Sequence, residues 1–444
     1  MQQRCRIEEK DSGRKLVERL IQPANKISGE ITPPGDKSIW HRALLIGAIA
    51  NGETEISGIP AGLDVESTKQ CLIDLGVSIT YSDGKTIVYG KGTNGLKKPD
   101  GLIDVGNSGT TVRLLSGVLA AQEFETVLDG DSSIRKRPMN RIVTPLSLMG
   151  ARISSAPSGG CPLTIKGNPD LNSIKYDMPV ASAQVKSAIL LAGVCARVSV
   201  TLSEPHPSRD HTEIMLRECG ATIEKDNGNL RLEPCSELRA AKFKIPDDFS
   251  SAAFFITAAL LIDGSDLLIK NVGLNPTRIG FLNVVMDMGA DIEIRNSKEE
   301  SGEITGDIFV RHSNLKAVSI TAETVPSIID ELPLIGILGA KAEGITKVSG
   351  AGELRVKESD RISLLVNGLR SVGVTADEFE DGFSVRGNQS IIGGEVDTGG
   401  DHRLAMTFAI AGLASKNGVT VRDAESSSVS YPSFFSELDK LSSN

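Results

Sequence analysis

The stretch that decides the fold is Gly35-Asp36-Lys37-Ser38-Ile39-Trp40-His41-Arg42-Ala43, followed by an apolar run over 44–50 and a polar stop at Asn51-Gly52. This pattern predicts a glycine turn and then a helix whose first turn carries Lys37 and Ser38. Because successive helical residues are about 100° apart, Ser38 and Arg42 lie within about 40° of each other. A cation, a hydroxyl and an arginine around the free N–H groups of a helix start favour a phosphate or carboxylate. The alternative is a solvated helix start with a surface lysine and arginine.

A helix of this kind, with small apolar residues and a polar start, recurs six times at intervals of about 70 residues. The copies span 37–50, 107–121, 182–196, 250–261, 327–340 and 399–414. A second helical pattern follows each copy, and the sixth of these runs from Tyr431-Pro432 to the C-terminus. The other five end on glycine, the residue type that stops helices, at Gly76, Gly150, Gly220, Gly289 and Gly373. Short alternating segments after them predict strands.

Each repeat therefore holds two helices and a few short strands, and six stacked repeats divide into three plus three. The division is expected near Pro246-Asp247-Asp248, just before the fourth copy. Residues 20–32 precede the first repeat and are expected to pair with the second domain, so that two strands cross at the hinge. We predict an α/β protein with one domain of residues 36–246 and another of residues 16–35 plus 247–444. Residues 1–15 are expected to form a mobile extension.

Composition excludes several classes of protein. A net charge of −9 opposes binding to nucleic acid or to an anionic membrane. Six cysteines without CxxC spacing or a Cys/His cluster indicate reduced thiols in a cytoplasmic protein and oppose a structural zinc site. No apolar run reaches the roughly 18 residues of a membrane span, and the charged N-terminus lacks the apolar core of a signal peptide.

Polar residues at the helix starts indicate an anion site. They are Lys37, Asn107, Ser182 with Gln184, and Asp401-His402-Arg403. If the three helices of each domain run in parallel, their N-terminal ends converge toward a common cleft. Each exposed end stabilises an anion by roughly 0.3–1 kcal/mol. Several ends together predict a ligand with two or more negative groups.

Six motifs, in this order, resemble those of the 5-enolpyruvylshikimate-3-phosphate synthases (3-phosphoshikimate 1-carboxyvinyltransferases), from about residue 21 onward. They are the opening stretch, Gly106-Asn107-Ser108-Gly109-Thr110, Lys136-Arg137-Pro138-Met139, Ser182-Ala183-Gln184, Val356-Lys357-Glu358-Ser359-Asp360-Arg361 and Asp401-His402-Arg403 with Ala405-Met406. Ser182-Ala183-Gln184 and 208–212 resemble the class II branch. The resemblance implies a two-domain inside-out α/β barrel, the enolpyruvyl transferase fold, with three βαβαββ units in each domain.

The resemblance also implies a reaction. The enolpyruvyl group of phosphoenolpyruvate is transferred to the 5-hydroxyl of shikimate 3-phosphate, and phosphate is released, on the pathway to chorismate and the aromatic amino acids. No cofactor and no metal is implied. Both substrates carry a phosphate and a carboxylate, so the site needs cations, and arginine captures both groups bidentately. Arg113 is a further candidate cation.

Motif positions assign residues to each substrate. The shikimate 3-phosphate side is implied at Lys37, Ser38, Arg42, Ser182, Ala183, Gln184, Ser208, Arg209, Asp330 and Lys357. The phosphoenolpyruvate side is implied at Lys37, Asn107, Gly109, Arg137, Gln184, Arg361 and Arg403. Asp330 is expected to be the base toward the hydroxyl and Glu358 the group near the methylene carbon. Lys37 is expected to act as a proton donor or electrostatic clamp.

Simpler roles compete with these assignments. Any single arginine could form a surface ion pair, and Lys357 and Arg361, at i and i+4, could pair along a helix face. Arg137 could lie in a solvated loop, and Asp330 could cap a helix that continues through Pro333. Further expectations concern residues near the motifs: an exposed Glu331, a structural His402, and surface or packing roles for His206, His211 and His312.

Three residues depart from the family pattern or bear on it. Trp40 stands where a small hydroxyl residue is usual, about 160° around the helix from Arg42, which predicts local repacking. Val429 stands where some members carry a phosphate-facing lysine, so one cation is missing or supplied elsewhere. A methyl group at the position of Gly109 crowds the herbicide glyphosate in this family, so we predict a glyphosate-sensitive enzyme.

Two rival functions remain. The UDP-N-acetylglucosamine enolpyruvyl transferases share the fold but place a reactive cysteine where Ser132 stands here. A non-catalytic α/β clamp around DNA would need a basic inner surface, which the net charge opposes. We expect a monomer that is open without ligand and closed with substrates, because arginines brought together need anions between them.

Overall fold

The computed structural model describes residues 5–9, 15–59, 62–226 and 228–442. Chain contacts divide the protein into two compact units. Unit 1 comprises 1–34, 247–298 and 304–444, and unit 2 comprises 35–246 and 299–303.

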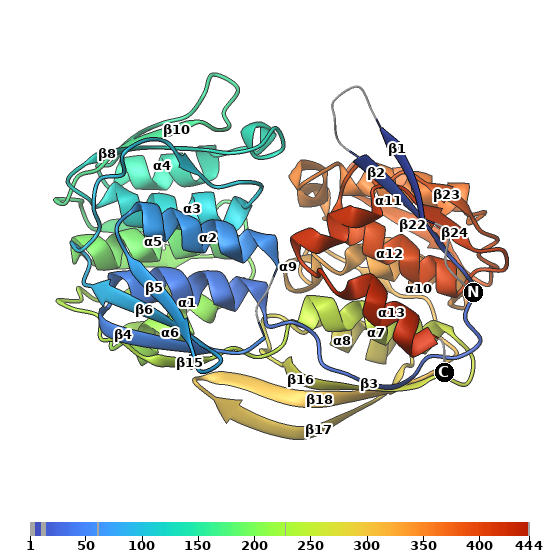
Figure 1. Ribbon diagram of the computed structural model, residues 1–444. Helices are drawn as coiled ribbons and strands as arrows, with labels where there is room; N and C mark the ends of the chain where they lie inside the picture. Colours follow the sequence, from blue (N-terminus) through green and yellow to red (C-terminus); the bar gives the residue numbers. More distant parts are fainter. Residues whose placement is uncertain (1–4, 10–14, 60–61, 227, 443–444) are drawn as a thin grey trace. The chain divides into compact units, whose positions relative to one another are not determined.

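Unit 2 has three inner helices that are buried almost throughout: α1 (Lys37–Ile49), α3 (Gly109–Ala120) and α5 (Ala183–Ala196). Three outer helices bury one face each: α2 (Leu63–Asp74), α4 (Asn140–Leu148) and α6 (His211–Glu218). Helices α3 and α5 lie side by side (Figure 1). A Cβ at Gly117 of α3 would come within 2.1 Å of the carbonyl oxygen of Ala188 in α5. The close approach of these two helices therefore requires glycine.

Three four-stranded sheets complete unit 2. The first runs β15 (Lys242–Lys244), β4 (Asn51–Ser57), β6 (Lys85–Lys91), β5 (Ser78–Ser82). The second runs β7 (Ile103–Asp104), β8 (Glu125–Asp129), β10 (Leu163–Lys166), β9 (Arg152–Ser154). The third runs β11 (Ile174–Asp177), β12 (Val200–Ser203), β14 (Asn229–Leu232), β13 (Ile223–Asp226). A short 3₁₀ helix, η1 (Ile134–Lys136), precedes α4.

Unit 1 repeats this plan. Its inner helices are α7 (Phe249–Leu261), α10 (Leu332–Lys341) and α12 (His402–Leu413), and its outer helices are α8 (Gly280–Asp287), α11 (Arg361–Ser371) and α13 (Phe434–Ser442). Shorter helices are α9 (Val325–Ile328), η2 (Gly352–Val356) and η3 (Ala424–Val429). The fifth inner helix thus begins at Leu332, later than the expected start at residue 327.

Three further four-stranded sheets belong to unit 1. The first runs β17 (Asp291–Glu300), β18 (Glu303–Arg311), β16 (Asp266–Gly273), β3 (Ser28–Ile31). The second runs β19 (Ser319–Ile320), β20 (Ile345–Val348), β22 (Gly382–Arg386), β21 (Ala376–Phe379). The third runs β1 (Cys5–Glu9), β2 (Lys15–Ile21), β24 (Val419–Val421), β23 (Gly394–Val396). The expectation that residues 20–32 pair with later repeats is confirmed, since β2 pairs with β24 and β3 with β16.

Every one of the six sheets has a parallel pair at one edge. This shared topology identifies six βαβαββ repeats, three in each of two inside-out α/β barrels with helices at the centre. The five expected glycine stops are confirmed, because Gly76, Gly150, Gly220, Gly289 and Gly373 all have φ between +83° and +99°.

The N-terminal residues differ from expectation. Residues 5–9 of the expected mobile extension form β1, which pairs antiparallel with β2. Without β1, strand β2 would be an edge with unpaired N–H and C=O groups, which a further strand satisfies. Residues 1–4 and 10–14 lie outside the described residues. Among the helices described, none has the length and apolar character of a membrane span.

Candidate active site

Side-chain caps fix where the inner helices of unit 2 begin. The caps are Asp36 for α1, Ser108 for α3 and Ser182 for α5, each accepting a hydrogen bond from a backbone N–H three residues on. Such caps stabilise a helix by about 1 kcal/mol. They place the predicted site residues Lys37, Gly109 and Ala183 at the first position of each helix.

The starts of α3 and α5 meet through Gln184. Its Nε2 donates to Thr110 Oγ1 at 2.9 Å, and its Oε1 accepts from Arg113 Nη1 at 2.6 Å. Arg113 also donates to the carbonyl of Pro138 at 3.3 Å. The structure therefore brings the third and second predicted helix starts together at one end of unit 2.

Arg137 is buried at this end and is not in a solvated loop, so that alternative is wrong. It donates to Asn107 Oδ1 at 2.5 Å and to Ser133 Oγ at 3.4 Å. A Cβ added to Gly109 would stand 2.7 Å from Arg137 Nη1 and 3.1 Å from Arg113 Nη1. Two guanidinium groups thus lie against the start of α3, where the helix dipole and both cations favour an anion.

Lys37 has a partner that no sequence motif indicated. Its Nζ lies 2.8 Å from Asp64 Oδ2, in the first turn of α2. An acid in a first helical turn is ordinary dipole compensation, so the sequence held no signal for this pair. Asp64 holds the lysine side chain in one orientation at the start of α1.

Arg42 braces α1 against α5 and α6. Its Nε donates to Thr212 Oγ1 at 2.7 Å, its Nη2 to Ser187 Oγ at 3.0 Å and its Nη1 to the carbonyl of Ser38 at 2.8 Å. Burial lowers the pKa of Arg42 from its usual value to about 10. The guanidinium therefore stays charged at neutral pH and is fixed in place beside Ser38.

His41 serves the packing of unit 2. Its Nδ1 lies 2.6 Å from Thr68 Oγ1, which in turn lies 2.6 Å from Thr111 Oγ1. Burial lowers the pKa of His41 to about 3, so the ring is neutral at working pH. Of the histidines expected to have surface or packing roles, His211 is buried 2.6 Å from Glu303, and His312 is half-buried 3.0 Å from Asp263.

Trp40 is buried in unit 2. The indole is 5% exposed, and its Nε1 donates to the carbonyl of Ile59 at 3.1 Å. A Cβ at Gly35 would come within 2.7 Å of that nitrogen, so glycine there leaves the space for the ring. The only tryptophan of the chain is thus a core residue of unit 2.

In unit 1, Asp330 lies between two arginines. Arg403, in the first turn of α12, donates from Nη1 to the carbonyl of Asp330 at 3.2 Å, and its Nη2 lies 3.6 Å from Asp330 Oδ2. Arg361, the first residue of α11, has Nη1 3.8 Å from Asp330 Oδ1 and pairs through Nη2 with Glu358. The predicted acids Asp330 and Glu358 and the predicted cations Arg361 and Arg403 therefore form one cluster.

Asp401 anchors this cluster. It caps α12 by accepting from the N–H of Arg403 at 2.9 Å, and it accepts from Arg361 Nε at 2.8 Å. Burial is the largest single influence on Asp401 and would raise its pKa, but the charge and hydrogen bond of Arg361 together with His402 outweigh burial and hold the pKa below its usual range. Burial would lower the pKa of Arg361, but the negative charges of Asp401, Glu358 and Asp330 together outweigh burial and raise that pKa. Both groups are charged, and the guanidinium plane is fixed.

Glu331, expected to be exposed, is fully buried. Its Oε1 lies 3.1 Å from Arg278 Nη1 and 3.9 Å from Arg403 Nη1, and it accepts from Ser250 of α7. Because α10 begins at Leu332, Glu331 is the N-cap position and faces the start of α7. No motif singled out Arg278, which lies 53 residues away along the chain.

Two alternatives from the sequence are wrong. Asp330 is not the N-cap of α10, because Glu331 occupies that position. Lys357 is not on a helix face with Arg361, because it follows η2 as its C-cap residue and α11 begins only at Arg361. Arg361 pairs instead with acids from three segments, which include Asp330 and Asp401.

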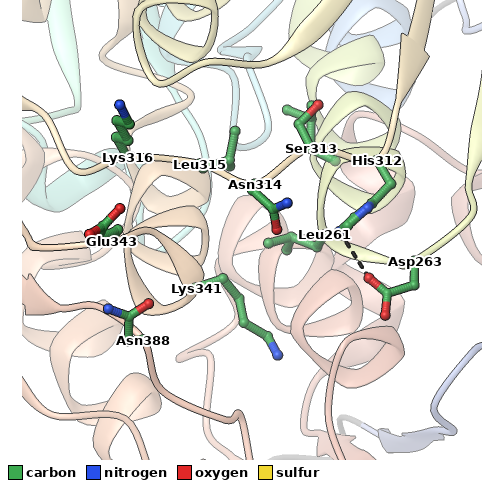
Figure 2. Close-up of a pocket in the computed structure, with 11 residues that line it drawn as sticks. Leu261, Asp263, His312, Ser313, Asn314, Leu315, Lys316, Lys341, Glu343 and Asn388 are labelled. Atoms are coloured by element: carbon green, nitrogen blue, oxygen red, sulfur yellow. Dashed lines mark ion pairs between the residues drawn. The ribbon is translucent and has the colours of Figure 1, made fainter.

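A separate hollow of about 520 Å³ lies in unit 1 (Figure 2). It is lined by the C-terminal ends of α7 and α10, through Leu260, Leu261 and Lys341, and by the segment 312–316. These helix ends are opposite to those that carry Asp248 and Glu331, and their dipoles disfavour an anion. The hollow is therefore not the candidate active site.

The two groups of three repeats define the enolpyruvyl transferase fold. The solved enolpyruvyl transferase NikO from Streptomyces tendae matches with a TM-score of 0.77 and 18% identity, over 96% of this chain and 97% of that chain, which shows the shared fold.

Residues 21–438 match the family model of EPSP synthase (3-phosphoshikimate 1-carboxyvinyltransferase). A 3-phosphoshikimate 1-carboxyvinyltransferase of Thermodesulfovibrio yellowstonii is 48% identical over 96% of this chain and 100% of its own length. Another, from Geobacter sp., is 48% identical over 94% of this chain and 98% of its own length. The structure of EPSP synthase from Acinetobacter baumannii matches with a TM-score of 0.83 and 42% identity, over 95% of this chain and 97% of that chain. The chain belongs to the EPSP synthase family.

Proposed function

We propose that the residues assembled at the helix starts of both units carry out the reaction of the EPSP synthase family. The chain transfers the enolpyruvyl group of phosphoenolpyruvate to the 5-hydroxyl of shikimate 3-phosphate and releases phosphate. The observation that supports this most is the cluster of Asp330, Glu358, Arg361 and Arg403, in which two acids and two arginines meet at the start of α12. The chemistry needs both proton transfer and capture of two anionic substrates.

The phosphoenolpyruvate side uses arginines and helix starts. Arg137 and Arg113 lie against Gly109 at the start of α3, and Asn107 accepts from Arg137. Arg361 and Arg403 supply the same type of planar, bidentate donor in unit 1. Four guanidinium groups match a ligand with one phosphate and one carboxylate, because each anionic group is captured best by paired donors.

The shikimate 3-phosphate side uses α1, α5 and the segment before α6. Lys37, Ser38 and Arg42 stand in the first turns of α1, and Ser182, Ala183 and Gln184 open α5. Ser208 and Arg209 precede α6, and Asp330 and Lys357 contribute from unit 1. Arg42 donates to three partners within its own unit, so the fold itself sets the orientation of its guanidinium.

Catalytic roles are assigned to three residues, two of which transfer protons. Asp330 accepts the proton of the attacking 5-hydroxyl as the oxygen adds to the central carbon of phosphoenolpyruvate. Glu358 acts at the methylene carbon, which gains a proton in this addition and loses one when phosphate leaves. Lys37 stabilises the phosphoenolpyruvate oxygens. Arg361 touches both Asp330 and Glu358, so it fixes the two acids relative to each other.

The proposal extends to the whole protein. The domain of residues 36–246 and the domain of residues 16–35 plus 247–444 each supply part of the ligand set. The protein acts as a cytoplasmic monomer.

A phosphate-release assay tests the proposal. Phosphoenolpyruvate and shikimate 3-phosphate together should release phosphate, whereas phosphoenolpyruvate with UDP-N-acetylglucosamine should not, since Ser132 stands where the rival family has its cysteine. Asp330→Asn and Glu358→Gln should lower kcat by about 10²- to 10⁴-fold, the usual contribution of a general acid or base. The proposal would be refuted if phosphate were released with the UDP-sugar but not with shikimate 3-phosphate, or if neither acceptor led to phosphate release.

A further inference from the structure

We propose that Lys186 is a positioning residue for the phosphate of shikimate 3-phosphate: it holds the segment of Ser208 and Arg209 in place and neutralises Glu204 beside it. This inference rests on the proposed function, which assigns Ser208 and Arg209 to that substrate. Lys186 itself lies in α5, two residues after Gln184, and does not touch the substrate.

Lys186 joins three segments of unit 2. Its side chain is 1% exposed, and its Nζ lies 2.9 Å from Glu204 Oε2 and 2.8 Å from Glu213 Oε1. The same Nζ donates to the main-chain carbonyl of Ser208 at 3.2 Å. Helix α5, the segment after β12 and helix α6 therefore meet at one buried cation.

Each of the three segments carries either a residue that is assigned to shikimate 3-phosphate or a residue that hydrogen-bonds to one. Helix α5 begins with Ser182, and the segment after β12 holds Ser208. Helix α6 carries Thr212, next to Glu213, and Thr212 accepts from Arg42. A displacement at Lys186 would thus move several groups of the same half of the site, and none of those assigned to phosphoenolpyruvate in unit 1.

Glu204 makes the charge of Lys186 important. The Ser208 hydroxyl donates to Glu204 Oε1, and the Ser208 N–H lies 3.5 Å from Glu204 Oε2. A carboxylate therefore stands against the donors that are assigned to the substrate phosphate. Without a neutralising cation, this carboxylate would repel a phosphate dianion.

The lysine remains charged in its buried position. Burial would lower the pKa of Lys186, but Glu213 and Glu204 together outweigh burial and raise it. Glu213 is fully buried, so its carboxylate also needs a neighbouring cation. Lys186 neutralises both Glu213 and Glu204. A purely structural role would predict a loss of stability with equal effects on both substrates. The positioning role predicts a much larger effect on shikimate 3-phosphate than on phosphoenolpyruvate, which shares only Gln184 of α5.

The test compares Lys186→Met, Glu204→Gln and the double variant Lys186→Met/Glu204→Gln. Lys186→Met should raise the KM for shikimate 3-phosphate by about ten- to a hundredfold, the equivalent of one lost charge-assisted interaction. The KM for phosphoenolpyruvate should rise by much less, because of the α5 residues only Gln184 is assigned to that substrate. Glu204→Gln should leave the KM for shikimate 3-phosphate unchanged or lower it, and the double variant should recover part of the loss. Lys85→Met, which removes a lysine from an exposed pair with Glu55, is the matched control and should have no effect.

Stability is tested separately. Lys186→Met leaves Glu213 buried without its cation, so Lys186→Met/Glu213→Gln is the variant of choice if the single variant does not fold. Calorimetric titration with shikimate 3-phosphate alone gives the affinity without turnover. A folded Lys186 variant with wild-type affinity, an equal rise in both KM values, or a Glu204→Gln variant as impaired as Lys186→Met would overturn the inference. Failure of the wild type to release phosphate would instead refute the proposed function.

Discussion

Gly109→Ala is the substitution whose effect follows most directly from the structure. The added Cβ would stand 2.7 Å from Arg137 Nη1 and 3.1 Å from Arg113 Nη1, whereas ordinary contacts begin at 3.4 Å. Arg137 must therefore move by about 0.7 Å, the difference between 2.7 and 3.4 Å. The backbone itself accepts alanine, because Gly109 lacks a left-handed φ and opens α3.

The shift strains the hydrogen bond from Arg137 to Asn107, now 2.5 Å long. Hydrogen bonds to charged groups contribute about 1.5–3 kcal/mol, so a partial loss predicts a rise of about tenfold in the KM for phosphoenolpyruvate. Stability should not fall, since replacing glycine in a helix reduces the entropy of the unfolded chain. We also predict that glyphosate inhibits the wild type in competition with phosphoenolpyruvate, with an inhibition constant below the millimolar range. The variant should bind glyphosate more weakly.

Steady-state kinetics with each substrate varied in turn, with and without glyphosate, measures both effects. Gly101→Ala is the matched control, because its Cβ would meet no atom within 4 Å. The reasoning fails if Gly109→Ala leaves the KM for phosphoenolpyruvate unchanged, or if its melting temperature and its kcat fall together. A millimolar inhibition constant for the wild type would refute the predicted glyphosate sensitivity.

Three further predictions concern stability. Burial raises the pKa of Asp247 to about 7 in the folded protein. Between a pH of about 4 and about 7 the Asp247 carboxyl is therefore protonated in the folded state but ionised in the unfolded state, so wild-type stability should fall as pH rises through this range. In urea unfolding, the free energy of unfolding of Asp247→Asn should rise relative to that of the wild type near pH 8 but not near pH 4. A difference between the two proteins that is the same at both pH values would contradict this. Trp40→Ser should lower the free energy of unfolding by about 3 kcal/mol, because the buried indole and its hydrogen bond to Ile59 are removed. An unchanged unfolding midpoint would contradict this prediction. Asp401→Asn should cost about 3 kcal/mol at neutral pH by breaking a buried pair with Arg361. Because the folded pKa of Asp401 is lowered, this deficit should shrink as pH falls below about 4, and a deficit that stays constant in acid would refute the assignment.

The local pattern of the chain determined the repeat and indicated many residues of the candidate site. Six inner helices, although the fifth begins later than expected, and five glycine stops with positive φ follow from spacing and residue type, because helix periodicity and the freedom of glycine are properties of neighbouring residues. The motifs around Lys37, Asn107 and Arg403 likewise indicated the enolpyruvyl transferase family through their residue types and their order along the chain. These signals span only a few residues each.

Only the tertiary structure decided which charges meet. Glu331 looked exposed and is fully buried beside Arg278, and Lys37 is paired with Asp64, 27 residues further along the chain. No motif singled out Lys186, which is enclosed by acids from two other segments. Burial and ion pairing depend on segments that become neighbours only when the repeats pack, and no local period encodes which segments these are.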